Sequence, residues 1–339
     1  MEVLRYAGFA EESSFAVSPA PAAHFCVDET AASIEAGSGS ELVYKGALGR
    51  AQRVHRPSFY SCEGDIEYAF DVRTIGWILK WALGGYVFSG AQALYLHEIY
   101  GSYETFLPTF CARLGKDKIN STDFEHAFSG CALDSLQLEV KDGYTTAKLA
   151  VKAAKDGKAN IMTRAAVESL LPTEYPLMFH EVTISRNNID VSAKVTGLKL
   201  EIKNNIKSES GRSLGSRFPR RMPAGSREVT FSLDMYYIDL DTLNLLWGGP
   251  SGPVTAGSTE VPLTITFNAG AGGSIVLTMP RCIFTKVPLP VKGQDPIDLS
   301  ADGEAFEDEI LLADDVTTVE TEILASITND QAEMAIGGS

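Results

Sequence analysis

Hydrophobic and polar residues alternate at every second position over many short stretches of this chain. Residues 66–70 are the clearest case, since large apolar side chains alternate there with polar or small ones. Successive side chains of a β-strand point to opposite faces, so this period of two is typical of a strand with one buried face. A hairpin turn is predicted at residues 141–143, Lys-Asp-Gly. Further strands are predicted over residues 133–140, 146–153, 177–185, 193–204, 228–237, 261–268, 274–279 and 283–287.

A few stretches have the 3.6-residue period of a helix instead. Residues 75–83 place their apolar side chains on one helical face. Asp71 or Thr74 can cap the start of this helix, and Gly84 can adopt the left-handed conformation that ends it. A short helix is also predicted over residues 162–171. The pattern as a whole predicts a mainly β (α+β) protein.

Two blocks of the sequence resemble each other. Residues 66–71 and 229–234 are alternating strands that end in Asp, and each is followed by a helical pattern that ends at a Gly-Gly pair. Cys131 and Cys282 open a second pair of similar stretches, each with a lysine ten residues later. The shared order and spacing favour duplication of one structural unit.

We therefore expect two tandem domains, each a β-sandwich or barrel-like unit with a flanking α-helix. A chain of 339 residues is long enough for each domain to have its own core. The first domain is predicted over residues 1–175 and the second over residues 176–339. The first 50 residues are rich in Ala, Ser, Gly and Glu and are expected to form an N-terminal arm or a weakly ordered hairpin.

The formal net charge is -15, and much of the excess lies at the C-terminus. No Lys or Arg follows Lys292, whereas acids recur through residues 293–339. Three outcomes are open for this acidic segment: it lines a tube, forms a strand near residues 305–313, or remains disordered. Tight binding of nucleic acid is not expected, because that affinity comes from Lys and Arg that neutralise phosphates.

Cysteine usage and hydropathy narrow the class further. The five cysteines are far apart and form no CxxC pair, so we expect reduced, mostly buried thiols and neither a disulfide framework nor a zinc site. No stretch reaches the roughly 18 to 20 apolar residues of a membrane span. The N-terminus lacks the basic flank and apolar core of a signal peptide, so maturation in a cytoplasm is expected.

No catalytic constellation is apparent in the sequence. His97-Glu98 lacks the second histidine of a zinc-protease helix, and the five histidines are scattered. Residues 270–273 are glycine-rich, but they lie between two predicted strands and are better explained as a hairpin turn than as a dinucleotide site. We therefore predict no enzyme activity, no cofactor and no metal.

One local feature indicates a specific contact. Residues 207–227 form a polar loop too long for a routine hairpin, and loops of this length are usually functional or disordered. The loop is either a solvated surface segment or an interface whose partner is another copy of this acidic chain, because Arg pairs well with carboxylates. Charge reversal of two of its arginines, Arg220 and Arg221, is then expected to impair polymerisation and leave the monomer folded. The arginines of the loop are Arg212, Arg217, Arg220, Arg221 and Arg227.

Several segments resemble the tail tube, or major tail, proteins of bacteriophages with long, non-contractile tails. The resemblance rests on the strand and helix of residues 64–85, on residues 131–153, and on the C-terminal half from residue 198 through the long loop to residue 280. It covers most of residues 60–310, with patterns of moderate specificity. The chain departs from the single-domain pattern of the family because it carries two similar blocks.

The resemblance implies a structural virion protein. Family members form rings that stack into a tube, with inner strands that build a continuous barrel and a long loop that reaches the next ring. Two domains per chain imply trimeric rings with pseudo-hexameric symmetry. The implied partners are further copies of the chain, the tape-measure and tail-terminator proteins of the tail, and DNA that crosses the lumen during ejection without specific binding. Assembly is expected in the host cytoplasm, without a membrane.

Two alternatives remain open, one structural and one a binding module, while a hydrolase with an unrecognised site ranks last because no nucleophile is paired with a base. The first is another virion component, such as a capsid decoration or tail-terminator protein. The second is a two-domain β-sandwich that binds carbohydrate, which exposed aromatic residues on one face would favour. Trp77, Trp81 and Trp247 instead lie in helical patterns and are predicted to be core residues.

Overall fold

The computed structural model describes residues 5–19, 25–27, 31–43, 54–90, 95–116, 124–236, 240–288, 298–314 and 316–332. Strands dominate these residues, and the prediction of a mainly β fold is confirmed. No helix in these ranges is both long enough and apolar enough to cross a membrane. The helical segments are α1 (Thr74–Leu83), α2 (Arg164–Leu170), α3 (Asp241–Trp247), η1 (Phe179–Glu181), η2 (Ser192–Lys194), η3 (Ser208–Gly211) and η4 (Gly270–Gly272).

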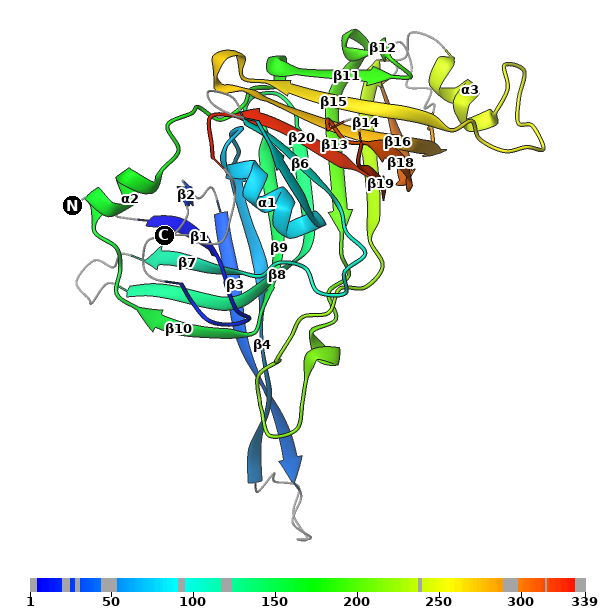
Figure 1. The fold of residues 1–339 in the computed structure, drawn as a ribbon. Helices are drawn as coiled ribbons and strands as arrows, with labels where there is room; N and C mark the ends of the chain where they lie inside the picture. Colours follow the sequence, from blue (N-terminus) through cyan, green and yellow to red (C-terminus); the bar gives the residue numbers. More distant parts are fainter. Residues whose placement is uncertain are drawn as a thin grey trace.

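An antiparallel sheet of eight strands crosses the whole molecule (Figure 1). We call it the shared sheet, because strands from both halves of the sequence build it. Its strands pair in the order β3 (Ala31–Val43), β4 (Val54–Ala69), β9 (Thr146–Ala153), β8 (Phe124–Val140), β13 (Val195–Lys203), β14 (Glu228–Tyr236), β17 (Asp298–Phe306) and β16 (Ser274–Lys286).

Two further sheets cover the apolar face of the shared sheet. The strands β8 and β16 belong to both layers, because the first part of each pairs in a cover sheet and the second part in the shared sheet. The first cover sheet consists of β2 (Phe25–Val27), β1 (Arg5–Glu11), β7 (Phe110–Lys116), the start of β8, and β10 (Lys155–Ala159). The second consists of β12 (Ile189–Asp190), β11 (Val182–Arg186), β15 (Val261–Asn268), the start of β16, β20 (Leu324–Asn329), β6 (Tyr95–Gly101) and β5 (Gly84–Ser89).

The strand order of the shared sheet occurs twice. The first four strands, β3–β4–β9–β8, come from the first half of the chain, and β13–β14–β17–β16 follow from the second half. The irregularities also coincide: Cys131 of β8 pairs with Phe110, and Cys282 of β16 pairs with Val261, each beside a break in register. Cys131 and Cys282 therefore occupy equivalent positions, as the sequence comparison indicated.

One detail of that comparison is wrong. Gly64 pairs with Val151, and Phe231 pairs with Gly303; these two pairs occupy equivalent places in the repeated strand order. Ile66 is therefore equivalent to Leu233 and not to Val229. The Asp71 carboxylate accepts hydrogen bonds from the backbone N–H groups of Arg73 and Thr74 at 2.7 and 2.8 Å, and so begins α1. Asp234 lies inside β14, paired with Ser300, and begins no helix. The sequence comparison aligned the two strands by the Asp that ends each of them, and strand pairing in the sheet does not follow that alignment.

Most of the core lies between the shared sheet and its covers. Trp81 of α1 is fully buried and stacks on Phe110 of β7, with ring centroids 4.4 Å apart. All five cysteines are unpaired and buried, as predicted. Burial raises the pKa of the Cys282 thiol to about 12, so it stays protonated at neutral pH.

The N-terminal segment is more ordered than predicted, and the acidic C-terminal segment forms strands, including one within residues 305–313, which was one of the outcomes left open from the sequence. Residues 5–11, assigned to a flexible arm, form β1, of which six residues are buried. The acidic segment after residue 297 forms β17, β20 and a separate hairpin of β18 (Asp308–Leu311) and β19 (Thr318–Thr321). Apolar residues at alternate positions explain this order, because they bury one face of each strand whatever the net charge. Residues 1–4, 44–53 and 289–297 lie outside the described residues.

Candidate functional site

The face of the shared sheet that points away from the covers is polar and acidic. Paired residues such as Gln137 and Glu201 lie on the same face, so the strand register identifies its members. Acidic side chains outnumber basic ones among the described residues of this face. Its acids are Glu35, Glu63, Asp65, Glu67, Glu139, Glu201, Glu228, Asp234, Asp302 and Glu304, and its bases are Lys148, Lys152, Lys199, Lys203, Arg281 and Lys286.

Several lysines of this acidic face are paired with carboxylates. Lys148 Nζ lies 2.9 Å from Asp65, and Lys203 Nζ lies 3.4 Å from Glu201. Lys152 lies 2.9 Å from Asp134, at the register break of β8. Such pairs contribute little to stability at an exposed surface. They do reduce the positive charge that a phosphate backbone would meet there.

Both ends of the shared sheet are open edges. At one end β3 pairs with β4, and at the other β16 pairs with β17 through residues 281–286. Among the described residues, no strand pairs with the second edge of β3, and residues 283–286 of β16 likewise have one neighbour strand. An open edge presents N–H and C=O groups that can pair with another chain. The shared sheet can therefore be extended at both ends by further copies.

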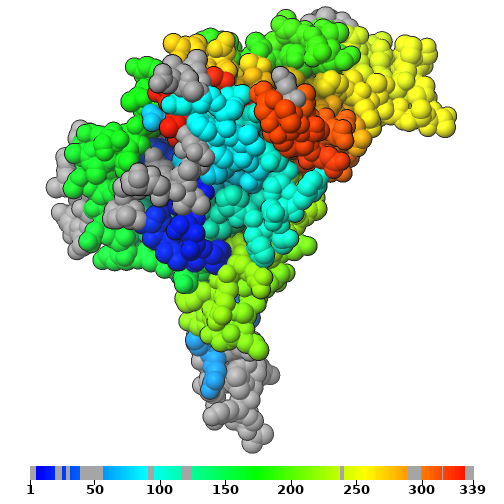
Figure 2. All heavy atoms as spheres, in the orientation of Figure 1, coloured from blue at the N-terminus to red at the C-terminus, as the bar shows by residue number. Residues whose placement is uncertain are grey.

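A third surface is a long arm formed by β3 and β4. The β4 strand leaves β9 at Cys62, but its pairing with β3 continues to Val54. The resulting ribbon projects far below the body in Figure 1, and Figure 2 shows the 207–227 loop packed against it. The loop that the sequence singled out therefore lies beside the arm of the other half.

The base of the arm is attached to the first cover sheet through Asp156 of β10. Asp156 accepts a hydrogen bond from Tyr60 of β4, and its other oxygen lies 2.9 Å from His126 Nε2 of β8. Burial alone would raise the pKa of the Asp156 carboxyl. The hydrogen bonds from Tyr60 and His126 outweigh that effect, so its pKa lies below the usual range.

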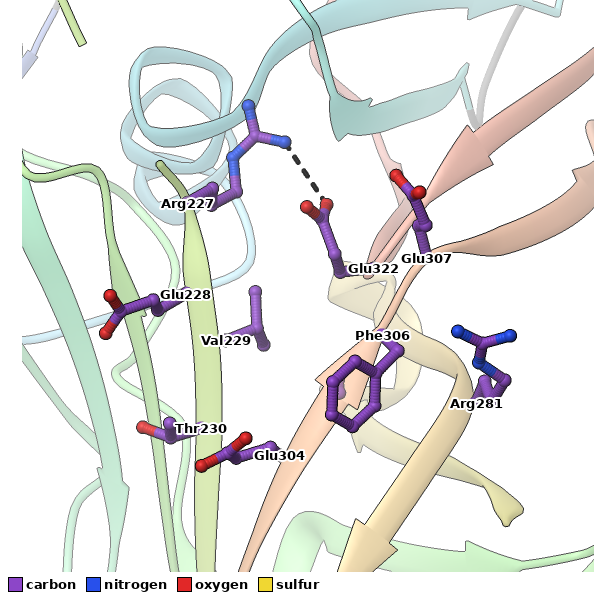
Figure 3. A pocket seen from close by; sticks show the side chains of 10 residues that line it. Arg227, Glu228, Val229, Thr230, Arg281, Glu304, Phe306, Glu307 and Glu322 are labelled. Atoms are coloured by element: carbon purple, nitrogen blue, oxygen red, sulfur yellow. Dashed lines mark hydrogen bonds and ion pairs between the residues drawn. The ribbon is translucent and has the colours of Figure 1, made fainter. Parts of the chain in front are cut away.

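The five arginines predicted as a site fall into three groups. Arg227 is mostly buried and holds the halves together within one chain (Figure 3): its guanidinium lies 3.3 Å from Glu322 and donates at 2.6 Å to the carbonyl of Ser102. Arg212 and Arg217 contact the β3–β4 arm. Arg220 and Arg221 are exposed.

Arg227 also borders a cavity of about 330 Å³ (Figure 3). The cavity lies where β14, β16 and β17 meet the corner before β20, and its walls mix carboxylates with two arginines. Arg281 is held over the ring of Phe306 there, at 5.8 Å from the ring centroid. Among the residues that the structure describes, no group of three His, Cys, Asp or Glu side chains has a geometry fit for a metal ion. The lining residues are Arg227, Glu228, Val229, Thr230, Arg281, Glu304, Ala305, Phe306, Glu307 and Glu322.

An open-edged sheet with an acidic face and a projecting arm has the features of a subunit that polymerises. Comparison with protein families supports this interpretation, because the model of the family described as phage tail tube protein matches residues 4–305. The chain belongs to the phage tail tube protein family. No curated protein matches it in a sequence search.

The tail tube protein is therefore a structural component of the virion tail, which self-assembles into the tube that conducts DNA. The resemblance inferred from the sequence is confirmed. Nothing in the match supports the decoration, tail-terminator or carbohydrate-binding alternatives.

The two open edges of the tail tube protein were not predicted from the sequence. The alternation in residues 31–43 is weak, because Ala, Ser and Gly dominate it, so β3 was not predicted as a strand. Weak alternation could itself have indicated an edge strand, since an edge strand that packs only in an assembly has few large apolar side chains.

Proposed function

We propose that three copies of the tail tube protein close into a ring with six similar positions. The two halves, residues 1–175 and 176–339, would each act as one tail-tube domain. The observation that carries this proposal is the repeated strand order of the shared sheet, which has an open edge at each end. Inside the chain, β8 of the first half pairs with β13 of the second. Between chains, the equivalent contact is β16 of one copy with β3 of the next.

The repeat specifies the register of that contact. Ser135 and Lys286 both follow the register break in their strands, so they are equivalent. Ser135 pairs with Lys203 within the chain. Gly64 and Phe231 are equivalent. Gly37 pairs with the residue three positions before Gly64, and Lys203 pairs with the residue three positions before Phe231. Gly37 is therefore the counterpart of Lys203. Lys286 of one copy is therefore expected opposite Gly37 of the next.

A disulfide tests the ring directly. Cysteines placed at Gly37 and Lys286 would face each other on the exposed side of the sheet, and directly opposed antiparallel residues have Cα atoms about 4.5–5.5 Å apart, within disulfide range. A Cβ at Gly37 meets nothing closer than 3.7 Å, so G37C is tolerated. Oxidised polymer of the double variant should give a covalent ladder that ends at three chains.

The single variants G37C and K286C serve as controls and should yield no ladder, because the native thiols are buried. A ladder that continues to six chains would contradict the trimeric ring. A double variant that forms tubes and yields no cross-link would contradict the β16–β3 contact.

The acidic face of the shared sheet would line the lumen. DNA phosphates meet mostly carboxylates there, so DNA can pass without the tight contacts that would hold it. In this role the protein needs no catalysis. Its further partners would be the tape-measure protein inside the tube and the tail-terminator protein at its end, with assembly in the host cytoplasm.

The exposed arginines of the loop are proposed as the contact with the next ring. Arg220 and Arg221 are both more than a third exposed, and Arg221 lies over the ring of Phe106 at 5.6 Å. Reversing both charges, R220E with R221E, should slow tube growth and leave the monomer folded. Normal growth of this variant would remove both arginines from the interface.

A further inference from the structure

The 207–227 loop is attached to the arm formed by β3 and β4. Beyond Cys62 this arm is a two-stranded ribbon, since β4 no longer pairs with β9 there. An isolated two-stranded hairpin is marginally stable in water at best. A ribbon of this length therefore needs support along its side.

Arg217 provides contacts to both strands of the ribbon. Its Nε donates to the carbonyl of Ser58 on β4 at 2.9 Å, and its Nη2 donates to Ser38 Oγ on β3 at 2.7 Å. The carbonyl of Arg217 in turn accepts a hydrogen bond from the backbone N–H of Tyr60 at 3.0 Å. One residue of the second half thus fixes the two strands of the first-half hairpin relative to each other.

Aromatic contacts extend this attachment. Phe218 packs edge-on against Tyr60, with ring centroids 5.4 Å apart. The guanidinium of Arg212 lies 4.0 Å from the centroid of the Phe59 ring. Lys155 of β10 approaches the other ring, Phe218, at 5.8 Å. The contacts form a continuous strip from the cover sheet along the ribbon.

The loop itself has a definite fold. The backbone N–H of Arg220 donates to the carbonyl of Gly211 at 3.0 Å, and a Cβ at Gly211 would lie 1.8 Å from the carbonyl of Arg221, so the two branches of the loop cross in close contact. At its base, Ile206 and Met222 are buried in a small apolar cluster with Leu107. A loop tied at its base and at its crossing can act as a rigid support.

We propose that the 207–227 loop is a splint for the β3–β4 hairpin, so that one composite arm replaces the two separate arms that a duplicated unit would have. The inference rests on the proposed ring in one respect: three chains then carry three arms, each built from both halves. Arg212 and Arg217 position the hairpin, and the inter-ring contact belongs to the hairpin together with Arg220 and Arg221.

Hydrogen exchange of the unpolymerised chain tests the splint without reference to the ring. In R217A with F218A, the amides of β4 over residues 58–61 should exchange about ten-fold faster, the change that corresponds to about 1.4 kcal/mol of local opening free energy. Amides of β14 and β17 should be unchanged. The matched control, R220A, removes a neighbouring arginine that makes no described contact with the ribbon and should leave the 58–61 amides unaffected.

Unchanged exchange at residues 58–61 in R217A with F218A would overturn the splint, and so would equal acceleration in R220A. Electron microscopy of tubes gives a second measurement. Three projecting arms per ring are expected, and six equal arms would overturn the composite arm while leaving the tube itself intact. Failure of the wild-type chain to form tubes would instead contradict the proposed function, and the exchange result would stand separately.

Discussion

The helices α1 and α3 follow equivalent strands but are buried to different extents. All ten residues of α1 are buried, whereas only Thr242 and Leu243 of α3 are. After α1 the chain forms the β5–β6 hairpin, which joins the second cover sheet through pairing of β6 with β20. After α3 a turn-rich segment over residues 249–260 takes its place.

This difference in burial reflects two kinds of junction. One joins the two halves inside the chain, and the other lies at the outer end of the second half and has no partner within a single chain among the described residues. Inside the chain the halves are joined by β8 with β13, by β6 with β20, and by the hydrogen bond from Arg227 to the carbonyl of Ser102. At the outer end of the second half, Leu240 is 42% exposed and β16 has an open edge. The two helices therefore follow equivalent strands but differ in their surroundings, and the exposed one lies on the side expected to meet a neighbour.

The largest expected effect compares the tryptophans of the two helices. Trp81 is fully buried, so W81A should lower the free energy of unfolding by about 3–5 kcal/mol through the cavity it leaves. Trp247 is only half-buried in one chain, so W247A should cost about 1–2 kcal/mol in the monomer. Urea unfolding of unpolymerised protein measures both. Equal losses would show that α3 is as fully packed as α1 and would contradict the comparison.

The next test concerns the junction inside the chain. R227M should lower the free energy of unfolding by about 2–4 kcal/mol, because it leaves the Glu322 carboxylate without its partner and two carbonyls without a donor. R220M is the control, since exposed substitutions usually change stability by less than about 0.5 kcal/mol.

Gly101 sharpens the same test. A Cβ at Gly101 would lie 2.0 Å from Nη1 of Arg227, so G101A should destabilise the wild-type chain. In the R227M background the contact with Nη1 is absent and the carboxylate of Glu322, at 2.9 Å, remains close, so G101A should cost less than in the wild-type chain. Additive effects in this double-mutant cycle would mean that Gly101 and Arg227 do not interact.

The smallest expected effect is the pH dependence of the stability that Asp156 contributes at the base of the arm. The folded-state pKa of Asp156 is depressed. The ionised carboxylate therefore stabilises the folded protein above the unfolded-state pKa of about 3.9, and this stabilisation is lost as pH falls through the folded-state pKa. D156N should therefore be less stable than wild type by about 1 kcal/mol at pH 6. The gap should narrow below pH 4. A gap that stays constant from pH 6 to pH 3 would assign the loss to packing and not to the charge.

The sequence determined the elements that depend on local pattern. Period-two alternation located β9 and β15 with their true ends, and the helical period located α1 to within one residue. These elements bury one face of their own, so their side-chain pattern records it. The similarity of the two blocks was also visible in sequence, since Cys131 and Cys282 were matched correctly, although the spacing to Asp71 and Asp234 gave a wrong register.

Tertiary structure alone decided how the elements combine. Strand pairing depends on residues far apart in sequence. Neither the equivalence of Ile66 and Leu233 nor the pairing of β6 with β20 could therefore be predicted from either stretch by itself. The arginine loop shows the same limit. Its composition marked five similar residues, but in the structure Arg227 pairs with Glu322 and Ser102, Arg217 contacts the arm and Arg220 is exposed at the surface. A side chain's role follows from what surrounds it, and the fold supplies those surroundings.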